Sequence, residues 1–197
     1  MAAVITLARP MPSPKGPPEL KHLDHVLITP LAIRRRIASL GDQLNADYAS
    51  KDMMVVAIVN GALIFAADLL RSLRSPLRLD CLRASSYHTG TRAVGEPRII
   101  DQMKLDVRGQ HVLLVDDILD TGKTLAAVAG LLKMKGAASV RTCVLLDKKA
   151  RRAVPFEADY VGFVIPNEFV VGYGLDFNER YRNLPCIGVL KPKYYAG

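Results

Sequence analysis

Short apolar runs recur along the chain, with room for a helix between several of them. The first covers residues 53–59 without a break, and four further strand candidates rich in apolar residues lie at residues 77–82, 111–115, 140–146 and 160–164. Continuous apolar runs of this length are typical of strands that are buried on both faces of a sheet. The pattern therefore predicts a sheet that is covered on both sides.

Helical periodicity marks other segments. In residues 30–48 four apolar positions recur at helical spacing: Ile33, Ile37, Leu40 and Leu44. Thr29 can cap this helix and Pro30 suits its first turn. Residues 64–73 and 125–135 have the same character. Because strands alternate with helices, we predict an α/β fold with a mostly parallel sheet flanked by helices.

The two parts of the chain differ in composition. Residues 1–20 contain five prolines, which predicts an extended or disordered N-terminal arm. The remaining residues, 21–197, contain no internal repeat and no linker. With half of its 197 residues apolar, the chain can bury one substantial core, so we predict a single domain.

Location and redox state follow from what the sequence contains. No apolar run approaches the roughly 20 residues that span a bilayer, and the N-terminus lacks the pattern of a secretion signal. These features predict a cytoplasmic protein without membrane contact. Cys81, Cys143 and Cys186 are odd in number and widely spaced, which predicts reduced thiols in the core.

The net charge of +8 favours anionic partners, which include both nucleic acids and small phosphorylated molecules. The basic residues are dispersed, and the densest runs are residues 34–36 and 148–152. The triple arginine at 34–36 lies in a predicted helix and is interpreted as a solvated face. Nucleic acid is therefore not expected as a partner.

Residues 112–124 carry the most specific chemistry. An apolar run ends at Asp116 and Asp117, and a short polar loop from Asp120 to Thr124 precedes a predicted helix. Ligands of open α/β sheets bind at the carboxyl ends of strands, and a helix N-terminus attracts anions. The P-loop motif is excluded, because it requires a glycine where Asp117 stands. A plain helix-capping turn is the alternative.

Three further segments are candidates for the same site. The turn at residues 59–62 also follows a strand and opens a helix, so it should lie on the same edge of the sheet. Residues 85–97 are too polar for a core and predict a lid or a mobile connection. In the C-terminal third, Lys148 ends a strand, and residues 169–176 combine an aromatic ring, two glycines and a carboxylate.

In these motifs the chain resembles the hypoxanthine–guanine phosphoribosyltransferases, members of the type I phosphoribosyltransferases. Paired acids precede an Ile/Val-x-Asp-Thr-Gly-x-Thr loop in that family, and this chain matches the pattern at Asp116, Asp117, Asp120, Thr121, Gly122 and Thr124. The resemblance extends from about His22 to about Ile187. It implies the type I phosphoribosyltransferase fold, with a small hood formed by the N- and C-terminal segments and a flexible lid at about residues 85–97.

The resemblance also implies roles for individual residues. It assigns binding of phosphoribosyl diphosphate (PRPP) to Asn60, Gly61, Ser86, Tyr87, Asp116, Asp117, Asp120, Thr121, Gly122, Lys123, Thr124 and Arg182. It assigns purine binding to Lys148, Phe169, Val170 and Asp176, and Mg²⁺ to Asp116, Asp117 and Asp176. Asp120 would be the general base. The family often has a cis peptide at the pair corresponding to Asn60 and Gly61.

The activity implied is transfer of the phosphoribosyl group from PRPP to hypoxanthine or guanine by a homodimer or homotetramer. Lys148 should reject adenine. Asp116 stands where many members have glutamate, and Asn60 where others have lysine or arginine, so we expect a diphosphate affinity different from theirs. The rivals are a pyrimidine or adenine phosphoribosyltransferase, and a regulatory protein of the same fold that senses PRPP or nucleotides and binds nucleic acid.

Overall fold

The computed structural model describes residues 17–85, 88–89, 92–93, 98–99 and 103–195. Its helices are α1 (Pro30–Asp47), α2 (Leu63–Ser72) and α3 (Lys123–Met134), with 3₁₀ turns η1 (Pro18–His22), η2 (Lys149–Arg151) and η3 (Pro192–Tyr194). Its longer strands are β1 (Leu23–Ile28), β2 (Met53–Val59), β3 (Leu77–Ser85), β7 (His111–Leu119), β8 (Ser139–Asp147), β9 (Tyr160–Val164) and β11 (Ile187–Leu190). Two-residue strands are β4 (His88–Thr89), β5 (Arg92–Ala93), β6 (Arg98–Ile99) and β10 (Val170–Val171).

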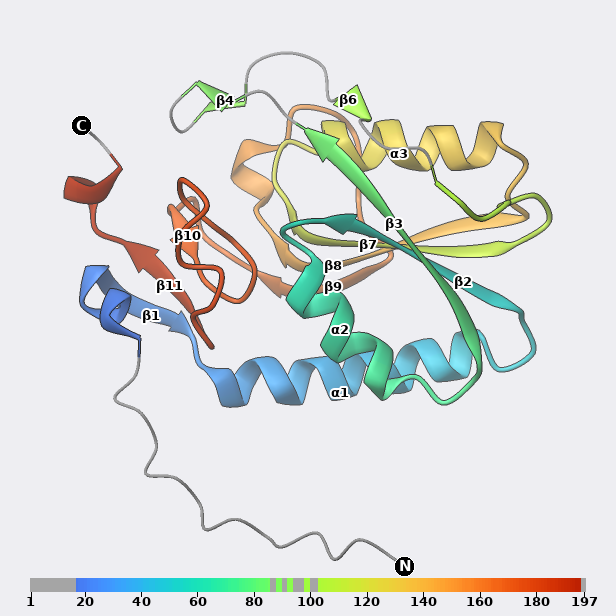
Figure 1. Ribbon diagram of the computed structural model, residues 1–197, viewed down its shortest axis with the longest axis horizontal. Coiled ribbons are helices and arrows are strands. Elements are labelled where there is room, and N and C mark those ends of the chain that lie inside the picture. The colour runs from blue at the N-terminus through green and yellow to red at the C-terminus, as the bar shows by residue number, and fades with distance from the viewer. Residues whose placement is uncertain (1–16, 86–87, 90–91, 94–97, 100–102, 196–197) are drawn as a thin grey trace, which may run out of the picture.

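The central sheet has the strand order β6-β3-β2-β7-β8-β9 (Figure 1). Its members from β3 to β9 pair in parallel, and β6 pairs antiparallel with the end of β3. In β2, Met53, Val55 and Ala57 face one core cluster. The alternating residues Met54, Val56 and Ile58 face another. β2 is therefore buried on both faces, as its continuous apolar run predicted.

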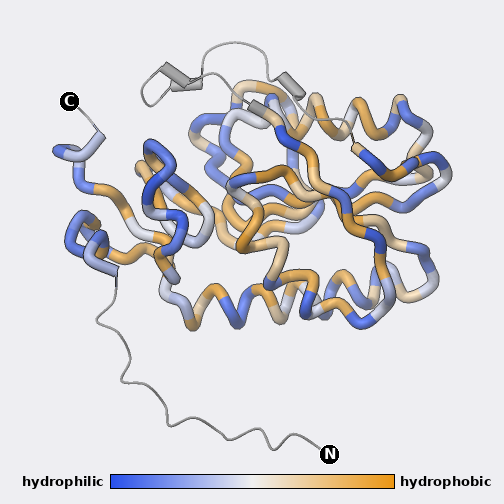
Figure 2. Tube along the Cα trace, in the orientation of Figure 1, coloured by the Kyte–Doolittle hydropathy of each residue, from blue (hydrophilic) through white to orange (hydrophobic). Residues whose placement is uncertain are grey.

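Helices cover the two faces of the sheet. Figure 1 shows α1 and α2 on one side and α3 on the other, and each helix contributes buried residues to the core cluster on its own side. The hydrophobic stretches lie mainly along the central strands, while the loops at the rim are more hydrophilic (Figure 2). The predicted α/β architecture is confirmed.

A second, smaller sheet stands beside the first. β1, from the start of the described chain, pairs antiparallel with β11, which also pairs with β10 (Figure 1). Its core includes Leu23, Val171, Leu184 and Leu190. The two ends of the chain therefore build one hood next to the carboxyl edge of the central sheet.

The predicted elements agree with the structure except near their ends. β7 continues to Leu119, so Asp116 and Asp117 lie in the last part of the strand and not after it. That extension occurs because β7 keeps its pairing with β8 as far as Leu119, beyond its pairing with β2. Residues 18–20, which were predicted to belong to an extended or disordered arm, instead form part of the 3₁₀ helix at residues 18–22. Residues 1–16 lie outside the described residues.

One arginine of the predicted solvated face is a structural contact. Arg34 and Arg35 are exposed, but Arg36 donates to the carbonyl oxygens of Val161 at 2.5 Å and Gly162 at 2.8 Å. These carbonyls belong to β9, the edge strand, so Arg36 joins α1 to that edge. The prediction for residues 34–36 is correct for two side chains and wrong for the third.

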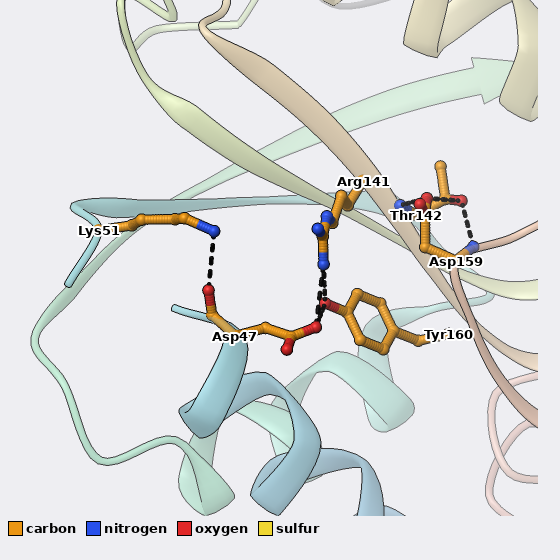
Figure 3. A network of polar contacts seen from close by, with 6 residues as sticks. All are labelled: Asp47, Lys51, Arg141, Thr142, Asp159 and Tyr160. Atoms are coloured by element: carbon orange, nitrogen blue, oxygen red, sulfur yellow. Dashed lines mark hydrogen bonds and ion pairs between the residues drawn. The ribbon is translucent and has the colours of Figure 1, made fainter. Parts of the chain in front are cut away.

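A polar network fastens the end of α1 to β8 and β9 (Figure 3). The Asp47 carboxylate accepts hydrogen bonds from Arg141 at 2.9 Å and from Tyr160 at 2.5 Å. Lys51 donates to the Asp47 carbonyl at 2.9 Å. The Tyr160 hydroxyl and the Arg141 guanidinium lower the pKa of Asp47. Lying at the amino-terminal ends of β8 and β9, this network is structural and remote from the loops described below.

Two further observations concern the burial of the cysteines and the length and apolar character of the helices. Cys143 and Cys186 are buried free thiols, but Cys81 is exposed, so the prediction that all three lie in the core is wrong. Cys81 faces outward because it lies in β3, which alternates its side chains between faces. Within the described part of the chain, no helix combines the length and apolar character needed to cross a membrane.

Candidate active site

A cavity of about 640 Å³ opens at the carboxyl edge of the central sheet, between the sheet and the hood. Thirteen residues singled out from the sequence line it: Asn60, Gly61, Asp116, Asp117, Asp120, Thr121, Gly122, Thr124, Lys148, Phe169, Val170, Asp176 and Arg182. Segments that are far apart in the sequence therefore meet at one site. Its size suits a ligand of nucleotide dimensions.

The two adjacent carboxylates lie at the end of β7. Asp116 is buried, and its Oδ1 accepts the backbone N–H of Asp117 at 3.0 Å. Asp117 Oδ1 accepts the N–H of Ile118 at 2.8 Å. Burial, together with the neighbouring Asp117 carboxylate, raises the pKa of Asp116 well above its usual range. Burial also raises the pKa of Asp117, although its hydrogen bonds and the charge of Arg182 oppose the shift. The pair is built to receive hydroxyl groups or a cation.

The turn after β2 touches this acid pair directly. A Cβ at Gly61 would overlap the Asp117 carboxylate, so any larger residue there would have to displace that carboxylate. The structure has a cis peptide between Val59 and Asn60. This bond lies one residue before the Asn60–Gly61 pair, to which the resemblance assigns the cis peptide that the family often has.

The loop from Asp120 to Thr124 leads into the N-terminus of α3. Gly122 is the residue before the helix and has φ +84°, a left-handed conformation that favours glycine. The first backbone N–H groups of α3 have no partner within the helix and can bind an anion. Lys123 is the first residue of α3, and it does not line the cavity as Thr121 and Thr124 do.

The Arg152 side chain fixes the backbone at the start of this loop. Its guanidinium donates to the backbone carbonyl of Asp120 at 2.8 Å and of Leu119 at 3.2 Å. It also pairs with the buried Asp147 carboxylate at 2.5 Å. The Ala153 N–H donates to the Thr121 carbonyl at 2.9 Å. The segment after β8 thus fixes the backbone of the loop.

The Asp120 carboxylate has two different environments. Its Oδ2 lies 3.3 Å from Nη1 of Arg151, which also lines the cavity. Its Oδ1 is buried and has no hydrogen-bond partner among the described residues. Arg151 was not anticipated as a site residue from the sequence. The feature that could have identified Arg151 is the basic run that directly follows β8, which was interpreted only as a local excess of positive charge.

Lys148 supplies a buried cation at the end of β8. It is only 5% exposed, and its Nζ donates to the backbone carbonyl of Glu168 at 2.8 Å. Burial lowers the pKa of Lys148, Arg151 lowers it further, and the Asp120 carboxylate opposes the shift. A buried donor of this kind can discriminate between an acceptor and a donor on a ligand.

Phe169 provides an aromatic wall. Its ring meets Phe177 edge to face at 5.6 Å and stacks on Tyr195 at 4.5 Å between centroids. The next residue, Val170, is buried in β10 and lines the same cavity. Phe177 was not anticipated from the sequence, although it lies in the same aromatic and glycine-rich run.

The loop after β10 closes the site on the side of the Gly61 turn. Arg182 pairs with the Asp176 carboxylate at 2.8 Å and donates to the Gly174 carbonyl at 2.8 Å. It also pairs with Glu179 at 2.9 Å. A Cβ at Gly174, which has φ +104°, would overlap the Gly61 carbonyl oxygen. The two turns therefore pack backbone against backbone.

The acidic residues can assist a metal but do not enclose one. Among the residues that the structure describes, no three His, Cys, Asp or Glu side chains are grouped to hold an ion. Both Asp176 oxygens are engaged, with Arg182 and with the Glu179 N–H at 3.0 Å. Mg²⁺ commonly binds to one or two protein carboxylates and completes its shell with water and substrate phosphates. The donor set fits an ion that arrives with a diphosphate.

Two predicted site residues cannot be placed. Ser86 and Tyr87, expected in a lid, lie outside the described residues, as do most neighbours in residues 85–97. β4 and β5, from the same segment, pair antiparallel with each other.

Comparison with known proteins places the chain among relatives that share most of its length. The model of the phosphoribosyl transferase domain family matches residues 25–178. The hypoxanthine-guanine phosphoribosyltransferase of Streptococcus pneumoniae (strain ATCC BAA-255 / R6) is 46% identical over 171 residues, which cover 87% of this chain and 95% of that protein. The bifunctional protein TilS/HprT of Listeria innocua is 47% identical over 174 residues, or 88% of this chain, but the match spans only 27% of that relative's length.

A solved structure agrees with the fold. The crystal structure of a hypoxanthine phosphoribosyltransferase from Staphylococcus aureus matches with a TM-score of 0.86 and 43% sequence identity. The match covers 90% of this chain and 97% of that one. The similarity therefore includes both the central sheet and the hood.

Proposed function

Because this chain belongs to the phosphoribosyl transferase domain family, we propose that it transfers the phosphoribosyl group of PRPP to N9 of hypoxanthine and guanine, a purine salvage reaction. The reaction releases diphosphate. One observation carries the proposal: a single cavity brings together an acidic pair, an anion-binding loop that begins with a carboxylate, and a buried lysine.

The acid pair and the loop would bind the sugar phosphate. Asp116 and Asp117 would accept hydrogen bonds from the ribose hydroxyls. The backbone N–H groups of residues 121–124 would donate to the 5′-phosphate at the N-terminus of α3. A raised pKa in the acid pair reflects two carboxylates in one buried place, which a hydroxyl donor or a cation would relieve.

A bound magnesium ion would neutralise charge that develops on the leaving diphosphate. Asp116, Asp117 and Asp176, which line the cavity, would hold it, directly or through water. Arg182 and the backbone amides of Asn60 and Gly61 would donate to diphosphate oxygens as their charge increases. Stabilising charge where it develops is a large part of catalysis.

Asp120 would act as the general base. The N9 lone pair attacks C1′, the C1′–O bond breaks with its electrons going to diphosphate, and the N7 proton moves to Asp120. Proton transfer of this kind contributes about 10²–10⁴ in rate. Asp120→Asn should lose activity on that scale and still bind nucleotide. Near-normal turnover in this variant would show that Asp120 is not the general base.

Base choice would depend on Lys148 and Phe169. The Lys148 ammonium is a donor, so it suits the exocyclic oxygen of a 6-oxopurine and leaves the amino group of adenine without an acceptor. Phe169 would stack on the purine ring, and the backbone at Val170 and the Asp176 region would meet its edge. These residues favour a 6-oxopurine over an adenine or a pyrimidine.

A spectrophotometric assay tests the proposal. Purified protein with PRPP and Mg²⁺ is given hypoxanthine, guanine, xanthine or adenine in parallel. Turnover of hypoxanthine and guanine, with adenine inert, is expected. Turnover of adenine would contradict the role of Lys148, and silence with all four bases would contradict the reaction. The comparisons give no support to a regulatory nucleic-acid-binding role.

Two further expectations accompany the activity. We expect a homodimer or homotetramer, which light scattering after gel filtration measures, and a monomer would contradict this. The cytoplasmic location expected from the sequence stays a prediction, which cell fractionation tests.

A further inference from the structure

We propose that Arg151 is a positioning residue, which holds the Asp120 carboxylate in the orientation needed to receive the purine proton. This inference rests on the function proposed above and adds a residue to it. Its basis is the ion pair between Arg151 Nη1 and Asp120 Oδ2 at 3.3 Å, at the wall of the cavity.

The state of the other carboxylate oxygen shows why an orienting partner is needed. Asp120 Oδ1 is buried and has no hydrogen-bond partner among the described residues. An unpaired buried acceptor costs about 1–3 kcal/mol, so this orientation is not one that the carboxylate would adopt for its own hydrogen bonding. The terminal torsion of an aspartate is soft and would not hold it. The ion pair at Oδ2 is the contact that opposes rotation.

The same oxygen can serve both partners. Asp120 and Arg151 side chains are each 28% exposed, so the pair borders the cavity while Oδ1 points away from solvent. A carboxylate oxygen has two lone-pair sites, so Oδ2 can accept from Arg151 and from a purine N–H together. Arg151 therefore need not leave when the base binds.

The chain gives Arg151 a firm support. It ends η2, where its backbone N–H donates to the Lys148 carbonyl at 3.4 Å. The next residue, Arg152, anchors the turn through Asp147 at 2.5 Å and holds the Asp120 backbone carbonyl at 2.8 Å. Two consecutive arginines therefore contact Asp120: Arg152 at its backbone carbonyl and Arg151 at its carboxylate. This arrangement is more specific than a general excess of positive charge.

A mutant series with hypoxanthine as substrate tests the inference. In Arg151→Ala we expect kcat to fall roughly tenfold, a part of the about 10²–10⁴ that a general base supplies. The KM values should change by no more than about twofold, since the contact matters in proton transfer and not in ground-state binding. Arg151→Lys should recover much of the loss, because it restores a cation near Oδ2.

A double-mutant cycle separates positioning from general damage. In an Asp120→Asn background, Arg151→Ala should cause little further loss, because the carboxylate that it orients is gone. Lys149→Ala is the matched control: it removes the same charge from the same turn, but Lys149 is exposed and pairs with Glu157 at 3.8 Å. Its kcat should equal that of the wild type. Thermal unfolding and IMP binding show whether each variant is folded.

The outcomes are distinct. If the wild type is active and Arg151→Ala has the same kcat, the positioning role is overturned and the proposed function is unaffected. An equal loss in both backgrounds, or in Lys149→Ala, overturns it as well, because the effect is then structural or electrostatic at long range. A wild type that uses no 6-oxopurine overturns the proposed function, and the positioning role with it.

Discussion

At the scale of single residues, the buried charge of Lys148 makes a pH-dependent prediction. Burial lowers the pKa of this lysine below its usual value of 10.5. As the pH rises, Lys148 should therefore lose its proton earlier than an exposed lysine. The neutral amine binds a purine oxygen less strongly, so the KM for hypoxanthine should increase on the alkaline side.

The test compares the wild type with Lys148→Arg across the alkaline range. An arginine stays charged throughout, so its KM should lack the lysine-dependent increase. Ionisation of hypoxanthine affects both proteins equally and cancels in the ratio. A constant ratio of the two KM values across that range would show that Lys148 does not control base binding.

At the scale of elements, the site depends on close packing between two turns from distant parts of the chain. Gly174→Ala places a methyl group against the Gly61 carbonyl and should push the turn that contains Asn60 and Gly61 away from the acid pair. A displacement near 1 Å can cost on the order of 10²-fold in rate. We therefore expect kcat/KM for PRPP to fall on that scale, as initial-rate kinetics can measure.

Gly109→Ala is the control for backbone strain. Gly109 also has a positive φ, +71°, but a Cβ there would meet nothing within 4 Å. It should lose some stability from the strained conformation, about 1–2 kcal/mol, and keep its kinetic constants. Equal kinetic losses in both variants would mean that strain, and not the contact between the turns, limits activity.

At the scale of the whole molecule, we expect the buried pair Asp116 and Asp117 to support activity and to lower the stability of the fold. The folded state raises the pKa of Asp116 above its ordinary value of 3.8. At pH values between the ordinary pKa and the raised pKa, Asp116 binds its proton more fully in the folded protein than in the unfolded chain. The contribution of Asp116 to the free energy of unfolding therefore falls as the pH rises. At neutral pH the buried pair therefore destabilises the fold.

Asp116→Asn removes that charge. Its free energy of unfolding should exceed that of the wild type at neutral pH, and the difference should shrink toward acidic pH, as urea unfolding at several pH values measures. Its affinity for PRPP should fall, because a ribose acceptor is lost. A variant less stable than the wild type at neutral pH would show that Asp116 has a structural role instead.

Much of this architecture could be predicted from local sequence. The apolar run at residues 53–59 became β2, and Thr29 caps α1 as predicted, with its Oγ1 accepting the Ala32 N–H at 3.3 Å. Thirteen of the predicted site residues line one cavity. Buried strands, amphipathic helices and caps depend on residues that are close in sequence, so a pattern of neighbours is enough to reveal them.

The order of the elements and the chemical groups at the edge of the sheet follow from local sequence, since both are local properties. Which of these groups touch depends on the tertiary fold. Arg151 looked like one charge in a basic run until the fold set it against Asp120. Arg36 looked solvated until α1 packed beside β9. Such pairings depend on how distant segments pack, and periodicity and short motifs carry no information about that packing.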